Sequence, residues 1–166
     1  MVGHGSIGRA VEARLAPFGA KVVGVASRAR EGVHGIDERA APIHTADAVV
    51  VLVPLSDATR GMFGAELLGR MRDGALLVNV SRGGVVDTDA LTAECAAGRL
   101  RAALDVTEPE PLPPGHPLWS TPGAVITPHI GGATQAMRPR AKALVRRQVE
   151  AMLAGSPLDN VVAGTS

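Results

Sequence analysis

Short apolar runs alternate with amphipathic stretches along most of this chain. The runs predict a strand stub at Val2 and five further strands over 21–25, 48–53, 75–80, 101–106 and 124–127. An apolar period of about 3.6 residues, or a suitable cap, predicts helices over 7–18, 65–71, 87–97 and 134–153. Strands that are separated by helices indicate a parallel sheet with right-handed crossovers. The pattern predicts an α/β fold with a doubly wound parallel sheet of the Rossmann type.

Small and polar residues mark the ends of the predicted helices. Gly19 and Gly98 follow the first and third helices, as C-cap residues do. Asp87 is placed to cap the N-terminus of the third helix. Pro139 lies in the last helix and should kink it or delay its start, because it removes the backbone bond to Gln135.

The turn between the strand stub and the first helix carries the glycine pattern G-x-G-x-x-G. Gly3 would permit a tight turn, Gly5 would let the backbone approach a pyrophosphate, and Gly8 would let helix and strand pack closely. The helix N-terminus, at Ser6 and Ile7, would turn free N–H groups toward the phosphates. We therefore predict a dinucleotide site here, with a purely structural glycine turn as the alternative.

The end of the second strand bears on the choice of dinucleotide. Sites that prefer NAD usually place an acidic residue there, but Val25 and Ala26 occupy the position. Ser27 and Arg28 follow, with Arg30 close behind, and a hydroxyl and a guanidinium suit a 2′-phosphate. We favour NADP over NAD. The alternative is that Arg28 and Arg30 are solvated loop charges.

Three polar motifs each follow a predicted strand. They read V-N-V-S-R-G-G over 78–84, L-D-V-T-E-P-E-P-L over 104–112 and I-T-P-H-I-G-G over 126–132. The carboxyl ends of parallel strands form one edge of the sheet, and open α/β sheets bind ligands at that edge. Three polar motifs at one edge are hard to explain by packing alone.

The residues in these motifs suit the reduction of a carbonyl group. Hydride addition leaves negative charge on oxygen, so a cation and a proton donor are needed beside it. Arg82 can supply the cation and can also bind a carboxylate. His129 can supply the proton, and a neighbouring carboxylate would keep it protonated and oriented. Glu110 is the candidate carboxylate, and Glu108 competes with it.

With its three motifs in this order, the chain resembles the D-isomer-specific 2-hydroxyacid dehydrogenases, over residues 3–162. The resemblance implies an oxidoreductase that transfers a hydride between NAD(P)H and a small 2-oxo or D-2-hydroxy acid. It implies Arg82 as the substrate-orienting residue, His129 as the acid/base and Glu110 as its partner, because spacing from Asp105 favours Glu110 over Glu108. Asp105 would hold the nicotinamide carboxamide. Further cofactor contacts implied by the resemblance are Val53, Pro54, Thr59, Val80, Ser81, Arg82, His129, Gly131 and Gly132.

The N-terminal end departs from that family pattern. Family members carry a second, discontinuous domain, whose main part precedes the phosphate loop. We therefore expect a largely missing substrate domain and a truncated first strand. Residues 1–133 should form the dinucleotide-binding domain, and residues 134–166 a helix and tail that would pack on the missing domain. A non-enzymatic NAD(P)-binding module, such as a redox sensor or a partner-binding protein, is the alternative function.

Composition adds little beyond this. A formal net charge of +1 gives no electrostatic reason to expect nucleic acid or an anionic membrane as partner. The single Cys95 cannot form an internal disulfide, and the longest apolar run is too short to span a bilayer, so we expect a cytoplasmic protein. No metal-ligand spacing is present, and we expect no metal. The resemblance implies a homodimer. The remaining histidines are interpreted as structural: His4, His34, His44 and His116.

Overall fold

The computed structural model describes residues 1–159 and 161 of the chain. The chain forms two compact units. The first covers Met1–His129, and the second begins at Ile130. All the strands that the structure describes belong to the first unit, whereas the second contains one long helix, α5.

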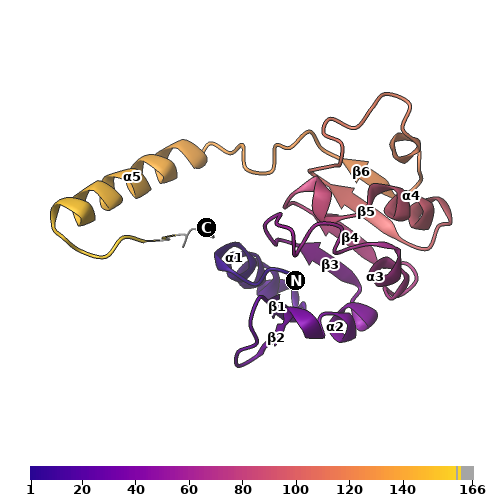
Figure 1. Cartoon of the computed structure of the whole chain (residues 1–166), viewed down its shortest axis with the longest axis horizontal. Coiled ribbons are helices and arrows are strands. Elements are labelled where there is room, and N and C mark those ends of the chain that lie inside the picture. Colours follow the sequence, from indigo (N-terminus) through magenta and orange to yellow (C-terminus); the bar gives the residue numbers. More distant parts are fainter. Residues whose placement is uncertain (160, 162–166) are drawn as a thin grey trace. The chain divides into compact units, whose positions relative to one another are not determined.

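The first unit is built on a parallel sheet (Figure 1). Strands β3 to β6 pair in sequence order, and β1 pairs with β2. Val2 forms isolated parallel bridges to Val25 in β1 and to Val51 in β3, so it joins the two groups. The resulting order, β2-β1-Val2-β3-β4-β5-β6, confirms the doubly wound sheet. The strands are β1 Gly24–Ala26, β2 Val33–Gly35, β3 Ala48–Val51, β4 Leu76–Asn79, β5 Arg101–Leu104 and β6 Ala124–Ile126.

Helices lie between most consecutive strands along the chain, but none separates β1 from β2. The α-helices are α1 Ser6–Leu15, α2 Ala40–Thr45, α3 Ala65–Gly69, α4 Thr88–Ala96 and α5 Met137–Leu153. Short 3-10 helices cover Ala16–Phe18, Ile36–Glu38, Gly83–Val85 and Pro117–Trp119. Ile7 and Phe18, both in the predicted apolar stripe of the first helix, are exposed, and Gly8 is the buried residue of α1.

The segment between residues 26 and 48 was incompletely predicted from the sequence. It contains β2 and α2, and the sequence pattern had indicated neither. A three-residue strand and a six-residue helix that contains Pro42 are too short to show a clear apolar period. The second strand also begins at Gly24 rather than Lys21, because the registered pairs with β2 start there.

The predicted caps are confirmed. Gly19 and Gly98 follow their helices with φ angles of 69° and 70°, the left-handed conformation that glycine adopts without strain. An oxygen of the Asp87 carboxylate accepts a hydrogen bond of 3.0 Å from the Ala90 N–H at the start of α4. Helix α5 begins at Met137 rather than residue 134, which places Pro139 in its first turn, where a missing N–H costs least.

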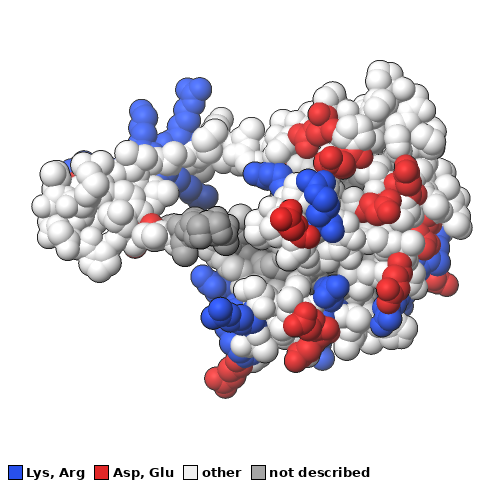
Figure 2. Space-filling model, viewed as in Figure 1, with Lys and Arg blue, Asp and Glu red and all other residues white. Residues whose placement is uncertain are grey.

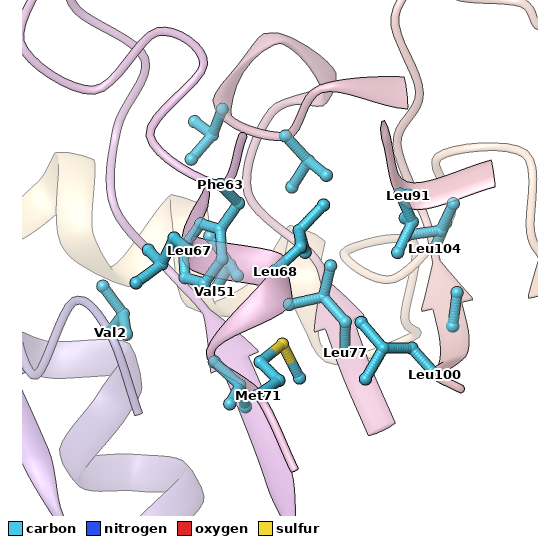
Figure 3. Close-up of a cluster of buried hydrophobic side chains, with 14 of the residues drawn as sticks. Val2, Val51, Phe63, Leu67, Leu68, Met71, Leu77, Leu91, Leu100 and Leu104 are labelled. Atoms are coloured by element: carbon cyan, nitrogen blue, oxygen red, sulfur yellow. The ribbon is translucent and has the colours of Figure 1, made fainter. Parts of the chain in front are cut away.

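The core of the first unit lies between the sheet and helices α3 and α4 (Figure 3). Phe63, Leu68 and Leu77 are fully buried there. Cys95 is 1% exposed and packs among these residues as a small apolar side chain, and burial raises the pKa of its thiol. This core fixes the positions of the strand ends that carry the motifs.

The side chain of Arg99 joins the end of α3 to helix α4. Its two terminal nitrogens donate to the carbonyls of Leu68 and Met71, at 2.6 and 2.7 Å. Its Nε also bonds to the Glu94 carboxylate, and this bond raises the pKa of Arg99. The guanidinium therefore adds charged donors at the C-terminal end of α3, where the Leu68 carbonyl also accepts from the Met71 N–H at 3.1 Å.

Acidic and basic side chains are interspersed over the visible face of the first unit (Figure 2). This mixture agrees with the formal net charge of +1. None of the helices in the described part of the chain combines the length and apolar character that crossing a bilayer requires.

Candidate active site

The phosphate loop has the close contacts that its glycines predict. Gly3 has a φ of 104°, and a Cβ there would lie 2.5 Å from the Leu52 carbonyl carbon and 2.7 Å from the Val53 nitrogen. A Cβ at Gly8 would lie 3.0 Å from the Gly3 oxygen. At Gly5 a Cβ would meet no protein atom within 4 Å, so the space beside it is open. The loop therefore fits a pyrophosphate, which could approach the backbone at Gly5.

The start of α1 offers donors to such a ligand. The first intrahelical bond runs from the Arg9 N–H to the Gly5 carbonyl at 3.0 Å. The N–H groups of Ser6, Ile7 and Gly8 therefore have no acceptor within the helix. Ser6 and Ile7 are exposed, and the partial positive charge at a helix N-terminus favours an anion there.

The loop after β1 contains two arginines, of which Arg30 bonds to His4 and Arg28 has no hydrogen bond or ion pair among the described residues. The Arg30 Nη2 donates to the His4 carbonyl at 2.6 Å and lies 3.1 Å from the His4 Nδ1. Arg30 is nevertheless exposed, so the alternative of a solvated loop charge stays open for it. Ser27 and Arg28 are exposed, and the alternative of a solvated charge stays open for Arg28.

The three motifs come together at the carboxyl edge of β4, β5 and β6. The Asp105 N–H donates to the Asn79 carbonyl at 3.0 Å, and the Thr127 Oγ1 donates to the Asp105 carboxylate at 2.6 Å. Asn79 is 1% exposed, and Asp105 is 8% exposed. A chain of hydrogen bonds thus joins one residue from each motif across three neighbouring strand ends.

Asn79 also shapes the turn that presents Arg82. Its Oδ1 accepts from the Ser81 N–H at 3.1 Å and the Ser81 Oγ at 2.8 Å, and its Nδ2 donates to the Arg82 carbonyl at 3.0 Å. Ser81 is buried, whereas Val80 and Arg82 are exposed. The Arg82 Nη1 donates to the Ser81 carbonyl at 2.6 Å, and Arg82 makes no ion pair with Glu110 within the described residues.

His129 contacts Glu110. The His129 Nδ1 lies 2.6 Å from the Glu110 Oε1, so the ring N–H donates to the carboxylate. Glu108 instead uses its backbone carbonyl to accept from the Thr88 Oγ1 at 2.7 Å. The His129 Nε2 makes no hydrogen bond among the described residues, and the side chain is 47% exposed. This nitrogen is therefore the one that could exchange a proton with a ligand.

The segment after β3 closes a turn beside the phosphate loop. The Thr59 Oγ1 donates to the Pro54 carbonyl at 2.6 Å and accepts from the Ser56 N–H at 2.8 Å. Val53 is buried against the position where Gly3 approaches it. This turn therefore holds Pro54 and Thr59, two of the predicted cofactor contacts, in place.

Gly131 and Gly132 belong to the second unit. Within that unit the Gly132 carbonyl accepts from the Thr134 N–H at 2.9 Å. Both remain predicted cofactor residues.

A hollow of about 440 Å³ lies elsewhere in the first unit, beside α2 and α3. Arg39, Met62 and Leu67 are among the residues that line it, and none of the predicted site residues does. Among the described residues, no group of three or more His, Cys, Asp or Glu side chains is placed to hold a metal ion.

Sequence reasoning missed two residues that organise this site. Asn79 stood within a quoted motif without a role, although a polar residue at the end of a buried strand was a usable signal. His4 was interpreted as structural, and the structure places it between Arg30 and Glu12. No pattern in the sequence pairs these three residues.

Comparison with known proteins identifies the family of this chain. The family model described as "D-isomer specific 2-hydroxyacid dehydrogenase, NAD binding domain" matches residues 1–131. A glyoxylate reductase/hydroxypyruvate reductase of Homo sapiens is 36% identical over 165 residues, which cover 95% of this chain and 50% of that protein. The chain spans about half the length of the curated relatives that it matches.

Two solved structures are similar to this chain over nearly its whole length. A D-isomer specific 2-hydroxyacid dehydrogenase from Xanthobacter autotrophicus Py2, in complex with NADPH and MES, is 38% identical with a TM-score of 0.86, covering 98% of this chain and 69% of that one. An NADPH-dependent glyoxylate/hydroxypyruvate reductase from Sinorhizobium meliloti, in complex with NADP and sulfate, is 31% identical with a TM-score of 0.86, covering 97% of this chain and 54% of that one.

Proposed function

The chain belongs to the D-isomer-specific 2-hydroxyacid dehydrogenase family, and from that premise we propose that it is the cofactor-binding part of an NAD(P)-dependent oxidoreductase. The reaction would interconvert a small 2-oxo acid and a D-2-hydroxy acid. The bound cofactor would supply or accept the hydride. The observation that carries the proposal is the 2.6 Å contact between His129 and Glu110, at an edge where three motifs meet.

The proposed division of labour follows from charge and exposure. His129 would donate a proton from Nε2 to the oxygen of the 2-oxo group, while Glu110 orients the ring and stabilises its protonated form. Arg82 is exposed beside the same edge, and its guanidinium would bind the carboxylate of the acid. A module that only binds the dinucleotide would need none of these three groups.

The fit of the phosphate loop supports a dinucleotide in this site. Gly3, Gly5 and Gly8, with the N–H groups of Ser6 and Ile7, would hold the pyrophosphate. Asp105 would hold the nicotinamide carboxamide. We favour NADP over NAD because Ser27 and Arg28 are exposed where a ribose 2′-phosphate would lie, and both solved relatives described above contain NADP or NADPH.

The substrate class rests on the relatives. Two of them are described as acting on glyoxylate or hydroxypyruvate, so we propose a 2-oxo acid of that size for this protein. Residues 134–166 would pack against a second domain. Homodimeric assembly and a cytoplasmic location, both expected from the sequence, are further parts of the proposal.

The experiment separates cofactor binding from catalysis. The matching segment of the human relative is replaced with this chain, and NADPH oxidation is followed with glyoxylate and hydroxypyruvate. His129→Ala should lower kcat by about a hundredfold or more, the usual contribution of a general acid, and leave the Kd for NADPH within about twofold. His34→Ala is the control, because that exposed histidine pairs with Glu38 outside the site. Unchanged turnover in His129→Ala refutes the proposed role, and absent cofactor binding refutes the proposed function.

A further inference from the structure

His4 occupies an unusual position in the phosphate loop. It fills the first variable place of the glycine pattern, and yet its side chain is turned into the protein, with 7% of the residue exposed. Glu12 of α1 lies on one side of the ring, where its Oε2 is 2.7 Å from Nε2. Arg30 lies on the other side, where its Nη2 is 3.1 Å from Nδ1.

These contacts fix the protonation of the ring by donor and acceptor logic. A guanidinium can only donate, so the His4 Nδ1 must accept and carries no proton. A carboxylate can only accept, so the His4 Nε2 must carry the proton and donate to Glu12. The imidazole ring of His4 thus connects a carboxylate to a guanidinium.

The backbone of the loop gives Arg30 a second acceptor. The same Nη2 donates to the His4 carbonyl at 2.6 Å, so His4 uses both its ring and its main chain to hold one nitrogen. The Nε and Nη1 of Arg30 make no hydrogen bond among the described residues, and they stay available to a ligand. The Nη2 of the guanidinium is therefore fixed, whereas the N–H groups of Nε and Nη1 can still donate to a ligand.

Gly24 makes room for this arrangement. A Cβ at Gly24 would lie 2.8 Å from the His4 Cγ and 3.0 Å from its Cδ2, which is too close for the ring to stay in place. The ring therefore packs directly against the backbone of β1. This contact offers a way to displace His4 without changing any of its atoms.

We propose that His4 is a positioning residue that fixes Arg30 between the phosphate loop and the end of β1, where Arg30 binds the 2′-phosphate of NADP together with Arg28. The inference rests on the proposed function, because it assumes a dinucleotide in this site. The ribose of such a cofactor lies at the end of the second strand, and its pyrophosphate lies at the glycine loop. Arg30 is anchored to the glycine loop and comes from the segment that follows β1, so it spans both places.

The test measures selectivity between the two cofactors. The purified chain is titrated with NADPH and NADH, and with 2′,5′-ADP and 5′-AMP as fragments with and without the 2′-phosphate. Arg30→Ala should reduce the preference for NADPH by about tenfold or more, as expected for a charge-assisted bond to phosphate. His4→Ala and Gly24→Ala should each reduce it by about fivefold, and affinity for NADH and 5′-AMP should stay within about twofold.

Conservative variants separate positioning from a structural role. The Asn side-chain oxygen in His4→Asn can take the place of Nδ1 and accept from Arg30, so this variant should restore most of the selectivity. The Gln nitrogen in His4→Gln can take the place of Nε2 and reach only Glu12, so it should not. Arg14→Ala is the control, since Arg14 is exposed and donates to the Ala10 carbonyl of its own helix.

Each outcome decides the inference. Equal losses of NADPH and NADH affinity in His4→Ala would assign His4 a structural role and overturn it, as would an unchanged preference in Arg30→Ala or an unselective wild type. If His4→Ala fails to fold, Arg30→Ala and His4→Asn still decide. A wild-type chain that binds neither cofactor refutes the proposed function itself, which distinguishes that failure from the failure of this inference.

Discussion

Gly83 is the position where one added methyl group should disturb the candidate site most. It follows Arg82 in the turn after β4, and its Cα faces the backbone of the next motif. A Cβ on Gly83 would lie 1.9 Å from the Thr107 oxygen, 2.1 Å from the Thr107 carbonyl carbon and 2.7 Å from the Glu108 nitrogen. Gly83→Ala therefore requires two loops to separate.

The size of the effect follows from what blocks the methyl group. Real Cβ contacts essentially never fall below 3.0 Å, so the backbone at Thr107 must move by about 1 Å. Overpacking costs about 1–3 kcal/mol and sometimes more, and the upper end applies because the obstacle is main chain rather than a flexible side chain. With about 2–4 °C of melting temperature per kcal/mol, a loss of about 3 kcal/mol lowers the melting temperature by about 6–12 °C.

Thermal unfolding of the two purified proteins, followed by circular dichroism, measures this shift. Gly69→Ala is the matched control, because Gly69 ends α3 and a Cβ there would meet nothing within 4 Å. That variant should keep its stability or gain about 0.5–1 kcal/mol. If Gly83→Ala melts within about 2 °C of the wild type, the close approach of these two loops is not a feature of the folded protein.

Three further substitutions or reactions test the packing beneath the site. Asp87→Ala should cost about 1 kcal/mol in urea unfolding, because it removes the cap of α4, and an unchanged midpoint would contradict this. Arg99→Ala should cost about 2 kcal/mol or more by the same assay, since it leaves the Leu68 and Met71 carbonyls without their charged donor. Cys95 should react with a thiol reagent at pH 8 far more slowly in the folded than in the unfolded chain, because burial blocks access and raises its pKa; equal rates would argue against burial.

The order of the sheet was predictable because the information is local. Runs such as 48–53 are apolar throughout, and buried parallel strands need such runs on both faces. The segment that contains β2 and α2 was not predictable in the same way, because its strand is only three residues long and partly exposed. Its position depends on pairing with β1, which is a contact between distant parts of the chain.

The candidate site was likewise predictable in part, where the information is local in the sequence. Glu110 was preferred over Glu108 by spacing, and the structure brings Glu110, rather than Glu108, to His129. The reason for two adjacent glycines after Arg82 was not visible, because the obstacle to a side chain at Gly83 is a carbonyl that lies 24 residues away in sequence. Motif spacing can therefore indicate which residues meet, whereas close backbone approach requires coordinates.

His129 is held in an unusual backbone conformation by hydrogen bonds to its neighbours. Among the described residues it is the one non-glycine residue with a positive φ, 54°, a conformation that costs about 1–2 kcal/mol for a residue with a Cβ. Two contacts hold it there, the 3.0 Å bond from its N–H to the Thr127 carbonyl and the 2.6 Å bond to Glu110. Thr127 is in turn bonded to Asp105, which ties His129 to the ends of β5 and β6. If His129 is the proton donor that we propose, these bonds would balance the strain and hold the ring in place when charge develops on a substrate oxygen, an arrangement that lowers a barrier.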